Sequence, residues 1–105
     1  MERVDWLIFA CRRRNVKEVR RIISEGVDIN VQGRAGMTVL MVSMSTDVSI
    51  EIARILLGCK NIKIDIKGKD GYTALYYACM YDQVEKLKLL LAHPTCNKDI
   101  VQIKI

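Results

Sequence analysis

The sequence predicts an all-α fold in which three similar pairs of helices lie side by side. The phrase GMTVL at residues 36–40 returns 35 residues later as GYTAL at 71–75. Each phrase opens a stretch whose apolar residues stand three and four positions apart, which is the period of an amphipathic helix. Each predicted pair is too short to bury its own apolar side, so neighbouring pairs must cover one another.

The first unit, about residues 4–31, has no glycine–threonine turn before it, which is typical of a terminal capping unit. Its first helix has an apolar face at helical spacing: Trp6, Leu7, Ala10 and Cys11. Asp5 is the expected N-cap, because its carboxylate can accept a bond from a free backbone N–H group of the first turn. A second helix follows over 16–23 and should end at Gly26, where a positive φ costs little.

The second unit, about residues 32–66, opens with a turn over 32–36. We expect its helices over 39–45 and 49–57. Its exit at 58–65 alternates Lys, Ile and Asp and could be mistaken for a β-strand. An exit of the same length in the third unit indicates an extended loop instead.

The third unit, about residues 67–99, contains the clearest helix signals. Thr73 can cap its first helix through the side-chain hydroxyl. Its two apolar faces carry Leu75, Ala78 and Cys79 and then Val84, Leu87, Leu90 and Leu91. Residues 99–105 look like the start of a fourth hairpin. The strongly apolar second helix favours a longer array, or a covering partner chain, over a naturally short protein.

The phrase glycine-x-threonine-x-leucine, followed by a small pair and a leucine-rich helix, resembles the ankyrin repeat. The family phrase is T-P-L-H with a period near 33 residues. Here Val39 and Ala74 replace the proline, and Met41 and Tyr76 replace the histidine. The resemblance implies an ankyrin-repeat solenoid that forms one domain over residues 1–105.

Composition narrows the class of protein further. Half of the 105 residues are apolar, so disorder is not expected, and the net charge of +5 is mild for a nucleic-acid binder. No apolar run reaches the ~18 residues that span a bilayer, and no secretory signal is visible. Cys11 and Cys79 take the same place in their units, where the middle unit has Met44. This pattern favours reduced, space-filling thiols and a cytoplasmic location, with the nucleus as the alternative.

The sequence offers little support for a catalytic site or a metal-binding site. His93 and Cys96 could supply two zinc ligands, but a structural zinc site needs four and no second close pair is present. The stretch GKDG at 68–71 resembles a phosphate loop, yet its lysine is not followed by Ser or Thr. We therefore predict no enzyme activity, no cofactor, no metal and no small-molecule substrate.

The resemblance implies binding to a partner protein through hairpin tips and the inner surface of the first helices. Carried over position by position, the expected contact residues are Arg12, Arg13, Arg34, Met37, Met41, Lys69, Asp70, Tyr72, Tyr76, Met80 and Tyr81. Tyrosine offers rigid amphipathic contact area, and methionine offers an adaptable apolar floor. Tyr77 is expected to pack mainly between units. A partner with an acidic or apolar surface fits this set.

Two other functions remain open at this point. The chain could bind nucleic acid or acidic lipid through its basic residues, which are Arg12 to Arg14, Arg20, Arg21, Lys67 and Lys69. Acidic residues interleave these positions, so the sequence favours the protein partner. The chain could also be a structural segment of a longer array with no partner of its own.

Overall fold

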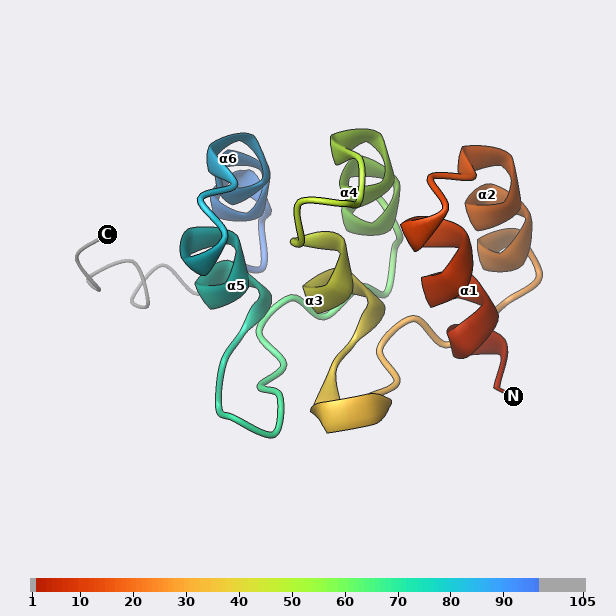
Figure 1. The fold of residues 1–105 in the computed structure, drawn as a ribbon, viewed down its shortest axis with the longest axis horizontal. Helices are drawn as coiled ribbons and strands as arrows, with labels where there is room; N and C mark the ends of the chain where they lie inside the picture. The colour runs from red at the N-terminus through yellow and green to blue at the C-terminus, as the bar shows by residue number, and fades with distance from the viewer. Residues whose placement is uncertain (1, 97–105) are drawn as a thin grey trace.

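The computed structural model describes residues 2–96, and these form three helix pairs in two rows. The elements are α1 (Arg3–Arg12), α2 (Val16–Ser24), the 3₁₀ turn η1 (Arg34–Gly36), α3 (Val39–Ser43), α4 (Ile50–Leu57), α5 (Ala74–Met80) and α6 (Val84–Ala92). Helices α1, α3 and α5 form one row, and α2, α4 and α6 form the other (Figure 1). No β-strand occurs in residues 2–96, so the predicted all-α stack is confirmed. The expected fourth hairpin at 99–105 lies outside the described residues.

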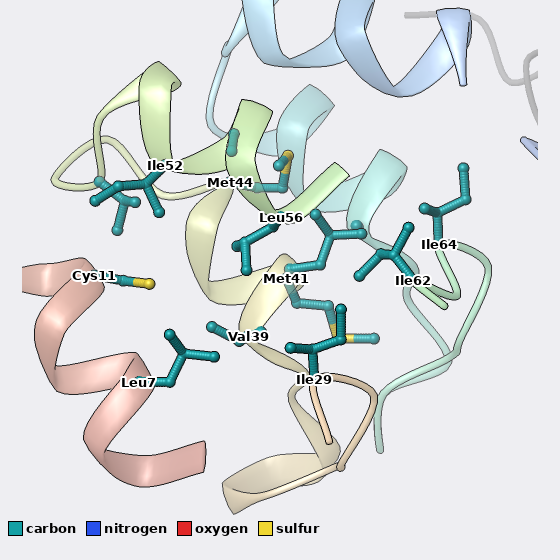
Figure 2. Close-up of a cluster of buried hydrophobic side chains, with 14 of the residues drawn as sticks. Leu7, Cys11, Ile29, Val39, Met41, Met44, Ile52, Leu56, Ile62 and Ile64 are labelled. Carbon is teal, nitrogen blue, oxygen red and sulfur yellow. The ribbon is translucent and has the colours of Figure 1, made fainter. Parts of the chain in front are cut away.

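One apolar core runs through the stack. Leu7 and Cys11 on α1 point towards Val39 on α3, and Leu56 of α4 lies in the same cluster (Figure 2). The repeated leucines Leu40 and Leu75 are both buried. Each unit thus covers apolar surface that its neighbour cannot cover alone.

Threonine side chains cap the starts of α3 and α5. In α3 the Thr38 hydroxyl accepts from the Met41 N–H at 3.2 Å, and in α5 Thr73 accepts from the Tyr76 N–H at 3.4 Å. The predicted threonine cap is therefore confirmed. Each cap satisfies one of the backbone donors that a helix start leaves free.

Asp5 is not the N-cap of α1, because the helix begins two residues earlier, at Arg3. Glu2 takes the cap position, and the Asp5 carboxylate accepts from the Glu2 N–H at 3.0 Å. Asp5 therefore supplies the return bond of a capping box from the third helical position. The sequence prediction thus has Asp5 in the correct turn, the first turn of α1, but at the wrong position within that turn.

The exits from the first two units are extended loops that are joined by an asparagine. The Asn30 side chain donates to the Asn61 carbonyl at 2.8 Å and accepts from the Lys63 N–H at 2.9 Å. Ile62 and Ile64 are buried on the same stretch, which explains the alternating pattern at 58–65. The expected loop is confirmed here, since apolar residues can alternate along a loop that lies on the core.

Candidate functional site

The two hairpin tips are held together by backbone and side-chain hydrogen bonds. The Lys69 N–H donates to the Ala35 carbonyl at 3.1 Å. The Gln32 amide donates to the carbonyls of Gly36 at 2.9 Å and Lys67 at 2.7 Å. Both tips project on the side of α1, α3 and α5 (Figure 1), so they form one fixed edge of the molecule.

Three of the predicted tip residues are exposed on this edge. Arg34 lies in η1, and Lys69 and Asp70 lie at the second tip. Met37 and Tyr72 are half-buried and pack against the core. The tips therefore offer mixed charge at their ends and apolar surface nearer the helices.

Four tyrosines form a ladder of rings from the second tip to the end of α5. The Tyr72 and Tyr76 rings stack with centroids 3.9 Å apart, and Tyr77 meets both rings edge-on at 6.0 and 6.4 Å. Tyr81 stacks on Tyr77 at 6.3 Å. Tyr77 is buried, as expected, whereas Tyr76 is half-buried. Ring contacts of this kind hold the exposed tyrosines in fixed positions.

The environment raises the pKa values of the inner phenols of this ladder. Hydrogen bonding with Tyr72 raises the pKa of Tyr76, and burial raises the pKa of Tyr77. A phenol with the ordinary pKa near 10 is already neutral at pH 7, and these shifts move both rings further from ionisation, so they present amphipathic surface rather than negative charge.

The ladder ends in the most exposed apolar surface of the third unit. Met80 is 49% exposed and Tyr81 is 43% exposed, while Val84 at the start of α6 is 51% exposed. Met80 and Tyr81 were predicted as contacts. The sequence predicts Val84 on the buried face of its helix, but the structure turns it outwards, and the buried residues of α6 are Lys86 and Leu90.

Met41 does not lie on the surface, so it cannot be a contact residue of the kind expected. Its side chain is only 2% exposed, and its sulfur lies 3.5 Å from the Thr38 nitrogen. Neighbouring units flank the middle unit on both sides. Tyr76, at the same position of the third unit, stays half-buried.

Two of the three consecutive arginines at the end of α1 bind to Asp47 in the second unit. An Arg12 nitrogen lies 3.1 Å from the Asp47 carboxylate, and the Arg14 Nε donates to the Asp47 carbonyl at 3.1 Å. Hydrogen bonding from Ser45, with a smaller contribution from Arg12, lowers the pKa of Asp47. Arg13 instead lies over the Phe9 ring at 5.4 Å. Within residues 2–96, Arg12 of the predicted pair is thus bound to a carboxylate and Arg13 is not.

A buried lysine joins the third unit to the same loop. Lys86 is 3% exposed, and its ammonium donates to the carbonyls of Ser45 and Val48, both at 2.6 Å. Burial lowers the pKa of this amine. Nothing in the sequence pattern singles out Lys86, since a lysine on an apolar helix usually reaches solvent.

Two aromatic side chains on α1 are exposed, which the apolar pattern of the sequence does not predict. Trp6 and Phe9 are each 53% exposed, although Trp6 was placed on the apolar face. The exposure of Trp6 could have been predicted from its alignment. Its equivalents Val39 and Ala74 are buried against the unit that precedes theirs, and no unit precedes the first one in residues 2–96.

The described residues hold no group of three His, Cys, Asp or Glu side chains that could bind a metal ion. The His93 Nδ1 lies 2.9 Å from the Thr95 hydroxyl and accepts from the Thr95 N–H, so this ring shapes a turn. Cys11, Cys59 and Cys79 are free thiols. None of the helices in residues 2–96 is long and apolar enough to cross a membrane.

Three stacked helix pairs joined by hairpin loops define a helical repeat protein. The chain matches the family described as ankyrin repeats (3 copies) over residues 7–102, and it belongs to that family. Modules of this family generally mediate protein binding and are typically non-catalytic.

Two relatives share part of their sequence with this chain. The mitochondrial disaggregase of Bos taurus is 31% identical over 85 residues, which cover 81% of this chain and 12% of the relative. A putative ankyrin repeat protein of Rickettsia bellii (strain RML369-C) is 38% identical over 65 residues, or 62% of this chain and 66% of the relative. The chain therefore spans only part of each relative.

A solved structure shares the fold. It is a chain in the complex of a predatory endopeptidase from Bdellovibrio bacteriovorus with an immunity protein, and it matches with a TM-score of 0.76 at 26% identity. The match covers 89% of this chain and 47% of that chain.

Proposed function

We propose that this chain is a non-catalytic module that binds a partner protein through its hairpin tips and the exposed end of α5. The observation that carries this proposal is the tyrosine ladder, which ends in exposed Met80 and Tyr81. Exposed tyrosines held by their neighbours lose little conformational freedom on binding, and such residues dominate the energetics of interfaces.

The charges around this surface indicate the kind of partner. Arg34 and Lys69 at the tips add positive charge beside Asp70, so a partner with an apolar centre and an acidic rim fits best. The solved ankyrin neighbour in a protein complex supports a protein partner. Free thiols at Cys11, Cys59 and Cys79 support a reducing compartment, which we propose to be the cytoplasm, with the nucleus as the alternative.

The proposal can be tested by site-specific photo-crosslinking in cells. A photoreactive phenylalanine analogue at Tyr81 should capture one partner protein, whereas the same analogue at Arg54 on the outer helix α4 should not. With the purified pair, Tyr81→Ala should weaken binding at least about tenfold, because interface tyrosines are frequent hot spots. Equal capture at both positions, or unchanged affinity of Tyr81→Ala, would place the interface elsewhere.

The basic-surface alternative makes a different prediction about salt. Arg12 is paired with Asp47, and Arg21 is paired with Glu18 and Glu25. We therefore expect the affinity for the partner to fall only shallowly with salt concentration. A steep fall of the logarithm of the binding constant with the logarithm of the salt concentration would indicate phosphate contacts instead.

A further inference from the structure

Four exposed side chains form one stripe along the outer side of α1. Glu2, Trp6, Phe9 and Arg13 follow one another at spacings of four, three and four residues, which places them on one side of a helix. The Arg13 guanidinium lies 5.4 Å from the Phe9 ring centroid. The stripe thus has an apolar aromatic centre, a negative group at its start and a positive group at its end.

The two aromatic residues occupy positions at which this fold packs helices together. Trp6 and Phe9 are each 53% exposed. Their equivalents in the second and third units are all buried: Val39, Val42, Ala74 and Tyr77. The exposed side of α1 therefore has the character of a helix-packing surface without its neighbouring helix.

The adjacent edge of α2 is unsuited to a complete additional unit. Glu18 stands where the later units have the buried Ile52 and Lys86. Arg21 forms ion pairs with both Glu18 and Glu25. Covering these charges would cost desolvation energy. A single helix lying along α1 would leave them in water, so the surface fits one helix better than a whole repeat.

We propose that this helix is α1 of a second copy of the chain, paired antiparallel with the first. The stripe is self-complementary, because reversing its direction exchanges the two charges. Arg13 of one copy then meets Glu2 of the other, and Trp6 meets Phe9. An interface about a two-fold axis requires this property, since each contact occurs twice. This surface is separate from the one proposed for the partner protein.

A contact between two short helices is small. It falls below the roughly 1,200–2,000 Å² of a stable interface, so we expect a weak, reversible dimer. Sedimentation velocity from about 10 µM to about 1 mM should show monomer passing into dimer. Trp6 is the only tryptophan of the chain, so its emission should shift to shorter wavelength over the same range. A single monomer species at every concentration would overturn the proposal.

Charge-swap variants test the pairing itself. Arg13→Glu places two carboxylates opposite each other and should weaken dimerisation at least about tenfold. Adding Glu2→Arg to the same chain restores opposite charges and should recover the dimer. Arg20→Glu makes the same charge change on α2 and should dimerise like the wild type. A dimer that survives Arg13→Glu, or that is not recovered by the double swap, would contradict the antiparallel pairing.

Two further variants separate this interface from other effects. Trp6→Ala should abolish the dimer while circular dichroism shows unchanged helix content, since the side chain is largely exposed. Tyr81→Ala should dimerise normally, because it changes only the surface proposed for the partner protein. Loss of the dimer in Tyr81→Ala would show that the contact involves α5 and not α1.

Discussion

Gly36 allows the two hairpin tips to approach closely. Its φ of +70° lies in the left-handed region that favours glycine, and a Cβ at this position would lie 2.6 Å from the Lys69 nitrogen. Gly71, at the equivalent position, has a φ of +82° but no atom within 4 Å of its Cβ position. Gly71 is therefore required by its backbone conformation alone. Gly36 is required both by its conformation and by the lack of space for a Cβ atom.

This pair gives a matched prediction for stability. Gly71→Ala should cost about 1–2 kcal/mol through the strained φ. Gly36→Ala should cost at least about 1 kcal/mol more, because the backbone of the neighbouring tip must move. Urea unfolding of both variants measures the difference. Equal losses would mean that the tips do not stay in contact.

The buried ammonium of Lys86 gives a second prediction at the residue scale. Lys86→Met should lower the free energy of unfolding by about 1–3 kcal/mol, since it leaves the Ser45 and Val48 carbonyls without their donor. Lys88→Met, on the exposed side of α6, should change it by less than about 0.5 kcal/mol. If Lys86→Met lowered the free energy of unfolding as little as Lys88→Met does, water would have replaced the amine as the donor to the two carbonyls.

The lowered pKa of Lys86 also sets the sign of a pH effect. The unfolded chain binds this proton more tightly than the folded chain. Stability should therefore rise as pH increases from the lowered pKa towards the ordinary value of 10.5. The wild type should show this rise relative to Lys86→Met, and parallel pH profiles would contradict it.

At the scale of the helix, small side chains determine how closely neighbouring helices pack. Ala78 is buried between α5 and its neighbours, whereas Cys79 is half-buried. Ala78→Leu should overpack the contact and cost about 1–3 kcal/mol. Cys79→Leu should cost less, because part of the larger side chain can reach solvent. Thermal unfolding of the two variants measures the order, and a reversed order would place the tight contact at Cys79.

The helices themselves could be predicted from local signals, whereas the exposure of a residue could be predicted only by also considering which units lie beside it. Thr73 and the apolar spacing after it carry their information within one turn, so the cap and the helix were predictable. The exposure of Met41 and Trp6 depends on which units lie beside them. Met41 belongs to the middle unit, which has a neighbour on both sides, whereas Trp6 faces away from the one neighbour of the first unit. Side-chain networks such as that of Lys86 depend on loop positions 41 residues away.

At the scale of the whole molecule, stability comes from the contacts between neighbouring units. The middle helix α3 is buried along its whole length, because the units on both sides pack against it. The end units each have one such interface. In a stack of this kind, the free energy is approximately the sum of the unit and interface terms.

Leu56 and Leu90 test this description, because they occupy equivalent positions in α4 and α6 and both are fully buried. Replacing either by Ala should cost about 2–5 kcal/mol. Leu56→Ala weakens the unit that both others need, so hydrogen exchange should quicken in all six described helices together. Leu90→Ala should quicken exchange first in α5 and α6, with α1 and α2 close to the wild type. If both variants gave the same uniform exchange pattern, the three units would behave as one cooperative block and the nearest-neighbour description would fail.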